Sequence, residues 1–221
     1  MNLMTLWLDP DVVGFISATF TICLSSTGIW TCWCIISEKS VGTRSYLPFL
    51  AGALMSSLWL LYGIVVNDNP MMFVNFIGSV LQSIYFIIFY LFTNDKSVPG
   101  RNGLIAVVSV LFIYVTVLNL PQLLQVVVAL GFICNAVTIA FFAAPLASIS
   151  QVIKTKNTES MSLPLTIASL LVTISWAFYG VLIHDKMVMF PNFLGFVLSA
   201  LQLGLFLKYP RKKVAQSPLP Q

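Results

Sequence analysis

Charged side chains are scarce in this sequence. Only 11 of the 221 residues are Lys or Arg and 7 are Asp or Glu, which is 8% in total, against roughly 25% in an ordinary soluble domain. Hydrophobic residues make up 58% of the chain and the mean hydropathy is +0.94, so there is more apolar surface than one core could bury. The scarcity excludes a single water-soluble globule and predicts a protein that is solvated by lipid.

Residues that carry out chemistry are also few. There is one histidine, His184, and the four cysteines lie in apolar runs without metal-ligand spacing. We interpret the cysteines as small packing residues: Cys23, Cys32, Cys34 and Cys134. We expect no metal site, no cofactor and no nucleic-acid partner. We also expect no catalytic residues and no enzymatic activity, because acid–base and covalent catalysis need groups that this chain lacks.

Seven apolar runs are long enough to cross about 30 Å of hydrocarbon as helices, which takes roughly 20 residues each. The predicted spans are 12–36, 46–66, 71–93, 103–120, 124–149, 163–183 and 187–207. No Asp, Glu, Lys, Arg or His lies inside any of them. Short polar loops join the spans, so neighbouring helices must be antiparallel. The sequence therefore predicts an all-α, polytopic membrane protein.

The basic residues indicate how the chain is oriented. Ten of the 11 Lys and Arg residues lie in alternate loops and in the tail 208–221, whereas the opposite loops hold only Lys186 and four aspartates. Basic loops face the cytosol, so we expect a cytosolic C-terminus and, with seven spans, an extracellular N-terminus. The basic tail is expected to anchor the last helix at the anionic inner leaflet.

An internal repeat covers much of the chain. Residues 59–81 and 176–198 align at a constant offset of 117, and 11 of the 23 positions are identical. The shared pattern is W-x2-Y-G-x4-D-x6-N-F-x-G-x-V-L. Such self-similarity indicates two copies of one structural unit.

The repeat divides the seven spans into three, one and three. The first copy covers 12–93 and the second covers 124–207, while the linker helix at 103–120 has no counterpart. Three antiparallel helices leave the chain on the opposite side of the membrane, and the linker helix restores the orientation of the second copy. The sequence thus predicts two parallel three-helix repeats related by an axis along the membrane normal, which is typical of transporters.

In these features the chain resembles the SWEET sugar transporters, a family with parallel repeats. The most specific stretches are PLASISQVIKTKNTESMSLPLTIASLL at 145–171, SWAFYG at 175–180 and PNFLG at 191–195, and the likeness is closer to animal members than to plant ones. The resemblance implies passive, bidirectional transport of a small neutral sugar by a protein that forms homo-oligomers. We expect the plasma membrane as its location, although family members also occur in internal membranes such as the Golgi.

Each repeat carries one Asn and one Trp that suit a sugar. An amide offers donors and an acceptor to adjacent hydroxyls, and an indole covers the C–H face of a pyranose. The helical rise places Trp59 and Asn75 in about one layer of the membrane. The resemblance implies that Asn75, Asn192 and Trp176 line the sugar pocket. Trp59 occupies the matching position of the first repeat, which favours a tighter cavity and a monosaccharide.

The resemblance also implies an extracellular gate. Tyr62 with Asp68, and Tyr179 with Asp185, are expected to close it by hydrogen bonds between the two halves. Lys186, next to Asp185, could occupy that carboxylate instead. Proton and sodium coupling generally need ionisable groups inside the spans, so their absence predicts alternating access without ion coupling.

Hinges are expected at the cytosolic ends of the spans. Pro48, Pro145 and Pro164 are the candidates, since a proline removes a backbone hydrogen bond and bends a helix. Prolines near helix ends also act simply as stop signals. The family usually has a fourth proline in the first span, where this chain has Gly28, which puts an intact four-proline gate in doubt.

Three other interpretations stay open. A seven-helix receptor would share the span count and the orientation, but it would not need the repeat or the short loops. A pore would need a filter loop that the sequence does not show. A membrane or trafficking partner that has kept the fold and lost transport is compatible with the sequence, and a flux assay in liposomes distinguishes it.

Replacing either pocket asparagine with alanine is expected to leave a folded protein that reaches the membrane and no longer transports sugar, because the hydrogen bonds to sugar hydroxyls are lost. Glucose uptake into proteoliposomes measures this. Undiminished uptake by both Asn75→Ala and Asn192→Ala would contradict the assignment. It would leave each amide with a packing role between helices, worth only about 0.6–2 kcal/mol.

Overall fold

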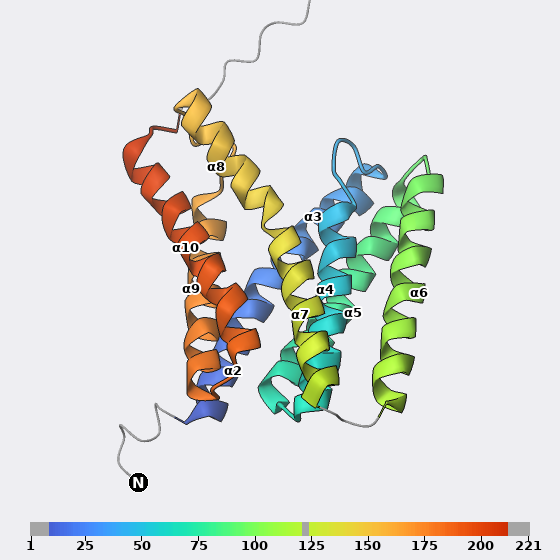
Figure 1. The fold of residues 1–221 in the computed structure, drawn as a ribbon. Helices are drawn as coiled ribbons and strands as arrows, with labels where there is room; N and C mark the ends of the chain where they lie inside the picture. Colours follow the sequence, from blue (N-terminus) through green and yellow to red (C-terminus); the bar gives the residue numbers. More distant parts are fainter. Residues whose placement is uncertain (1–8, 121–123, 212–221) are drawn as a thin grey trace, which may run out of the picture. The chain divides into compact units, whose positions relative to one another are not determined.

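The structure is a computed structural model that describes residues 9–120 and 124–211 (Figure 1). These residues form helices and connecting loops. The helices are α2 (Pro10–Ser25), α3 (Thr27–Glu38), α4 (Leu47–Val66), α5 (Asn69–Phe92), α6 (Ser97–Asn119), α7 (Leu124–Phe141), α8 (Ala143–Thr155), α9 (Leu163–Leu182) and α10 (Lys186–Lys208). Helix α3 continues α2, and α8 continues α7, after a break of a single residue in each case.

Within the described residues, seven segments are long and apolar enough to cross a membrane, which confirms the predicted number of spans. The two broken segments are the longest, Pro10–Glu38 and Leu124–Thr155. The linker helix of the predicted three-plus-one-plus-three arrangement is α6, which begins before the predicted start because the helix extends through the polar residues of the preceding loop. Of the predicted tail, residues 212–221 lie outside the described part.

The chain divides into two compact units, Met1–Thr138 and Ile139–Gln221. In the first unit α5 packs against α4 and also against α2 and α3, and α6 packs against α4. In the second unit α10 packs against α9 and against α8. In both units, therefore, the last helix of a repeat contacts both of the other two, as a duplicated three-helix unit requires.

Each unit brings two helices together closely at matching glycines. A Cβ atom on Gly63 would lie 3.1 Å from the backbone nitrogen of Met72, and one on Gly180 would lie 2.6 Å from that of Met189. A second pair of matching glycines lies further along the same helices. A Cβ on Gly78 would lie 2.8 Å from Ser56 Oγ. Its repeat counterpart Gly195 faces Thr173, with 2.7 Å to Cγ2. Small residues let the helix backbones approach, as membrane helix packing favours.

The turn that follows these helices is also duplicated. Asn67 and His184 both have a left-handed backbone, with φ of 57° and 55°. Asp68 and Asp185 come next and cap the following helices through their side chains. A left-handed residue followed by an acidic N-cap is an efficient helix–helix connection. The lone histidine therefore has a structural position in a turn.

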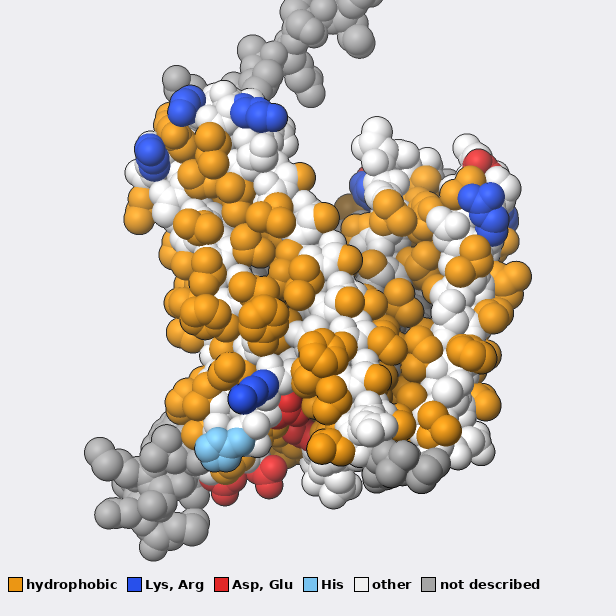
Figure 2. Space-filling view, viewed as in Figure 1, with side chains coloured by type: hydrophobic (Ala, Val, Ile, Leu, Met, Phe, Trp, Pro, Cys, Tyr) orange, Lys and Arg blue, Asp and Glu red, His pale blue; other side chains and the backbone are white. Residues whose placement is uncertain are grey.

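Charged side chains lie at the ends of the helices. In Figure 2, the Lys and Arg side chains of each unit gather at one end of that unit, apart from one basic side chain beside the histidine in the second unit. The surfaces between the ends are largely apolar, and large hydrophobic residues on α6 such as Phe112 are 71% exposed. Lipid is the solvent that suits such a surface.

The cysteines are free thiols, and two of them have the predicted packing role. Cys32 belongs to a buried cluster of the first unit with Ile35, Phe49, Tyr85 and Phe89. Cys134 is buried as well, whereas Cys23 is exposed and Cys34 is half-buried. For Cys23 and Cys34 the packing role stays a prediction.

Replacing Gly180 with alanine is expected to destabilise the protein by about 1–3 kcal/mol, because the new methyl group would meet the backbone of α10 and force the helices apart. The matched control is Gly204→Ala, where no atom lies within 4 Å of the new Cβ. That change is expected to be neutral or to stabilise the helix by up to about 1 kcal/mol. Thermal unfolding in detergent measures both, and equal effects of the two changes would contradict the close-packing argument.

Candidate functional site

The repeated Trp and Tyr form an aromatic pair in each unit. In the first unit the rings of Trp59 and Tyr62 meet edge to face, with centroids 5.5 Å apart. In the second unit Trp176 and Tyr179 do the same at 5.3 Å. Edge-to-face pairs of this kind fix the orientation of both rings. Each repeat thus holds its indole in one defined position on the helix.

The repeated Asn lies on the helix that packs against this pair. Asn75 is half-buried on α5, and its Nδ2 donates a hydrogen bond to the carbonyl of Met71, 2.9 Å away. Asn192 is half-buried on α10 and donates in the same way to Val188 at 2.8 Å. An amide has two N–H donors and a carbonyl acceptor. The contact uses one donor, so the second donor and the carbonyl oxygen can bind hydroxyl groups.

Trp59 has a further contact that the sequence analysis missed. Its Nε1 donates to Thr138 Oγ1 at 3.0 Å, and that hydroxyl donates to the carbonyl of Cys134 at 2.8 Å. The bond ties α4 to α7, and it occupies the polar edge of the indole. Trp59 can therefore offer a solute its ring face only.

The predicted extracellular gate residues have well-defined surroundings. Tyr62 and Tyr179 are buried, with 3% and 2% of their surface exposed. Asp68 Oδ1 accepts from the backbone N–H of Met71 at 2.8 Å, and Asp185 Oδ1 accepts from that of Met187 at 2.7 Å. Both aspartates are thus held at a helix start by backbone hydrogen bonds.

The structure corrects the physical reason given for two of the hinge prolines. Pro48 and Pro164 lie in the first turn of α4 and of α9, where the missing N–H would have no partner inside the helix anyway. They start helices and do not bend them. Pro145 differs, because it follows the break between α7 and α8 by three residues and lies inside a continuous membrane segment.

The first span is broken at the matching place without a proline. Helix α2 ends at Ser25 and α3 begins at Thr27. The Ser26 hydroxyl donates to the carbonyl of Ile22 at 2.8 Å, and the Thr27 hydroxyl donates to that of Leu24 at 2.7 Å. Such back-bonding by Ser and Thr bends helices.

Gly28 and Tyr85 complete this break. The Tyr85 hydroxyl donates to the carbonyl of Ser25 at 3.3 Å. The ring lies so close to α3 that a Cβ on Gly28 would be 2.7 Å from Tyr85 Cδ2. Gly28 is therefore the residue that lets an aromatic ring of α5 reach a carbonyl exposed by the break. Gln202 occupies the position of Tyr85 in the second repeat, and Pro145 that of Gly28.

Loops at the basic end of each unit are fastened by charged groups. In the first unit Arg44 pairs with Glu38, with 2.6 Å between Nη1 and Oε2. In the second, Lys156 Nζ bonds the Tyr209 hydroxyl at 3.1 Å, which lowers the pKa of Tyr209. The Thr158 N–H also donates to the carbonyl of Pro210 at 3.3 Å. The loop after α8 is thereby tied to the end of α10.

Sequence reasoning missed Tyr85, Thr138 and Pro191. Pro191 lies inside α10, one residue before Asn192, and is almost fully buried. Its presence within the quoted PNFLG stretch was a usable signal. Tyr85 and Thr138 contact residues 60 and 79 positions away, so no local pattern could have indicated them. Within the described residues, no cluster of His, Cys, Asp and Glu could hold a metal ion.

Known proteins share both the repeat and the fold. Residues 11–97 and 128–214 each match the family model described as "Sugar efflux transporter for intercellular exchange". The Sugar transporter SWEET1 of Drosophila pseudoobscura pseudoobscura is 42% identical over 187 residues, which is 83% of this chain and 82% of that protein. The human Sugar transporter SWEET1 is 33% identical over 211 residues, 94% of each chain.

A solved structure of a eukaryotic SWEET transporter at 3.7 Å resolution matches with a TM-score of 0.82 and 28% sequence identity. The match covers 90% of this chain and 97% of that chain. Fold and repeat together define a multi-pass membrane protein of the three-plus-one-plus-three transporter class. The chain belongs to the SWEET sugar transporter family, whose members are transporters and not enzymes.

Copying the second repeat's hinge into the first tests the role of Tyr85. Gly28→Pro alone is expected to lose most sugar uptake, because the ring of the proline would overlap Tyr85, an overpacking that costs about 1–3 kcal/mol. Adding Tyr85→Gln removes the overlap and reproduces the Pro145 and Gln202 pair. Uptake by the double variant is therefore expected to return to within about threefold of that of the unchanged protein. The two changes would then be non-additive, as is usual for residues in contact.

Uptake per protein delivered to liposomes measures this cycle. Tyr85→Gln alone is the control, and it is expected to lose only the hydrogen bond and the ring contact. Strictly additive losses in the double variant would show that Gly28 and Tyr85 do not act together at the break.

Proposed function

We propose that this chain carries a small neutral sugar, a glucose-like monosaccharide, across its membrane by facilitated diffusion. The observation that carries the proposal is the duplicated set of one asparagine and one tryptophan. In each repeat the tryptophan packs edge to face on a buried tyrosine, and the asparagine makes the same bond to the preceding turn. Two matching sets suit a solute with hydroxyls around its rim and C–H groups on its faces.

The relatives support the same substrate class. Proteins from animals as distant as a fly and human carry the name "Sugar transporter SWEET1" and align with most of this chain. The pattern residues Trp59, Asn75, Trp176 and Asn192 lie within the two stretches that match the family model. Trp59 is held by Thr138, and a bulky indole in each repeat favours a monosaccharide over a disaccharide.

Alternating access follows from the arrangement of each repeat's ends. Tyr62 and Asp68, with Tyr179 and Asp185, form the outer gate, because each aspartate is held at a helix start and phenol–carboxylate hydrogen bonds are strong where water is partly excluded. At the other end, the breaks beside Gly28 and Pro145 let the inner half of the first and fifth spans swing. Pro48 and Pro164 mark the starts of the neighbouring helices at that same inner gate.

Transport is uncoupled from ions. The apolar runs of the seven segments contain no Asp, Glu, Lys, Arg or His, and proton relays and sodium sites generally need such groups within the membrane. The direction of net transport is then set by the sugar gradient alone. The basic loops face the cytosol by the positive-inside rule, so the gate with the aspartates is extracellular. We place the protein in the plasma membrane or an internal membrane such as the Golgi, as a homo-oligomer.

Counterflow through the purified full-length protein tests the proposal. Liposomes loaded with unlabelled sugar and placed in labelled glucose, fructose or sucrose, without any ion gradient, are expected to accumulate labelled glucose and to exclude sucrose. The Asn75→Ala and Asn192→Ala double variant is the matched control and is expected to show no accumulation. An absolute need for a proton gradient, or equal counterflow of sucrose, would contradict the proposal. No flux of any sugar would favour a membrane partner that has lost transport.

A further inference from the structure

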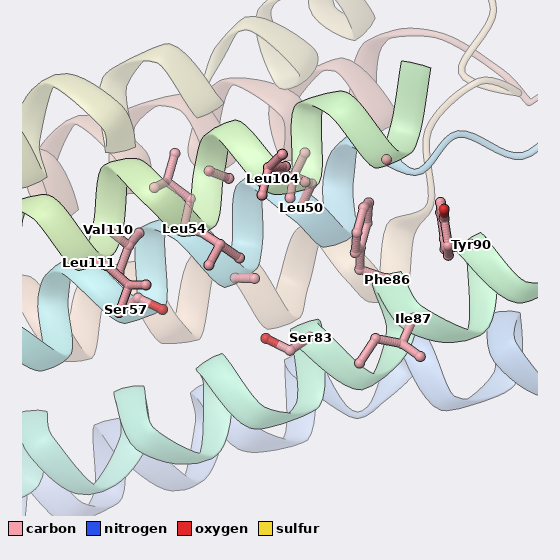
Figure 3. A pocket seen from close by; sticks show the side chains of 15 residues that line it. Leu50, Leu54, Ser57, Ser83, Phe86, Ile87, Tyr90, Leu104, Val110 and Leu111 are labelled. Atoms are coloured by element: carbon pink, nitrogen blue, oxygen red, sulfur yellow. The ribbon is translucent and has the colours of Figure 1, made fainter. Parts of the chain in front are cut away.

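The first unit contains a groove that the transport site does not use. It lies between α4, α5 and α6 and has a volume of about 490 Å³ (Figure 3). Its lining is apolar except for the hydroxyls of Ser57, Ser83 and Tyr90. The volume falls in the range of about 300–1,000 Å³ that is typical of small-molecule sites.

The linker helix is held to its neighbours at both ends of this groove. Asn102 Nδ2 donates to the Tyr46 hydroxyl at 2.8 Å near one end. The Tyr114 hydroxyl donates to the carbonyl of Ser57 at 2.7 Å near the other. These bonds fix α6 on α4, so the space between them is a defined feature of the fold.

The groove has the length of one membrane leaflet. Along α6 it is lined from Gly100 to Leu111, which is about 16 Å at 1.5 Å per residue, or about half of the roughly 30 Å hydrocarbon core. Figure 3 shows Phe86 and Tyr90 at one end and Ser57, Val110 and Leu111 at the other. One end thus lies at the basic loop and the other near the middle of α6.

Glycines on α6 shape the end of the groove that lies at the loop. A Cβ on Gly100 would lie 3.2 Å from the Tyr90 ring, and one on Gly103 would lie 2.9 Å from the Phe86 ring. Both aromatic rings therefore rest directly on α6 and line this end of the groove. Only the hydroxyl of Tyr90 brings a polar group to it.

Positive charge surrounds the same end. Lys96 Nζ lies over the Tyr90 ring, 5.7 Å from its centroid, and Arg101 is exposed on the first turns of α6. The nearby carboxylate of Asp95 already accepts from the backbone N–H of Ser97 at 2.9 Å and from its hydroxyl at 2.6 Å. Two positive side chains therefore lie near one carboxylate, so this end carries a net positive charge.

From this juxtaposition we propose that the groove binds one acyl chain of an anionic phospholipid, whose phosphate-bearing headgroup lies against Lys96 and Tyr90. The length of the groove matches a chain confined to one leaflet, and the charge at its end matches an anionic headgroup. A sterol would fill the apolar part but would leave Lys96 without an anion. The site is independent of sugar transport, and it places a lipid against the helix that joins the two repeats.

Native mass spectrometry of the purified full-length protein tests the lipid site. Palmitoyl-oleoyl phosphatidylserine and phosphatidylcholine are titrated separately, since they share their acyl chains and differ in headgroup charge. We expect about fivefold greater retention of phosphatidylserine, the factor that one lysine near an anionic headgroup contributes. Lys96→Gln is expected to remove that preference, whereas Lys154→Gln, an exposed basic residue in the second unit, is expected to keep it.

A second pair of variants tests the groove itself. Ala106→Phe places a ring in the groove and is expected to lower the retention of both lipids, whereas Val108→Phe, on the exposed side of the same helix, is expected to leave it unchanged. Equal retention of the two lipids by the unchanged protein, or a preference kept in Lys96→Gln, would overturn the proposal. Stronger retention of cholesterol than of either phospholipid would also overturn it and would assign the groove to a sterol. A loss of dimer in Ala106→Phe with lipid retention intact would overturn it too and would assign the groove to a second copy of the chain.

Discussion

The fold depends on close van der Waals packing between complementary helix surfaces. Apolar side chains gain little by leaving lipid for each other, and the apolar runs of the spans contain no Asp, Glu, Lys, Arg or His that could form ion pairs. Gly63 and Gly78, with Gly180 and Gly195 in the second repeat, bring neighbouring helices within reach of each other's backbone and small side chains. That approach sets how the helix with the repeated tryptophan lies against the helix with the repeated asparagine. The proposed sugar site therefore depends on this packing.

Much of the architecture was predictable from the sequence because the repeated pattern records contacts that are local or confined to one pair of adjacent helices. Its Trp and Tyr meet edge to face, its first Gly lies at a helix crossing, its Asp caps the next helix and its Asn bonds to the preceding turn. Tyr85 and Thr138 could not be found in this way. Their partners lie far along the chain, and a search for self-similarity passes over a residue such as Tyr85 that the other repeat replaces with Gln.

The prolines show why a residue type alone does not define a hinge. Pro48 and Pro164 occupy first turns, where the ring fits a helix that is just beginning. Pro145 lies beside a break in a continuous segment, where the missing N–H matters. The first span is also broken, at Ser26, Thr27 and Gly28. These residue types do not by themselves indicate a helix break in an apolar run. The repeat offset of 117 aligns Gly28 with Pro145, but the contact with Tyr85 is visible only in three dimensions.

The two breaks differ in one respect that bears on motion. At the second break, Pro145 has no N–H, so its backbone nitrogen donates no hydrogen bond in any conformation. The Tyr85 hydroxyl can leave the Ser25 carbonyl and return to it, so the first span has a joint that can be engaged or released. A movement of the first span at its break must therefore stretch or break a side-chain hydrogen bond that spans the break.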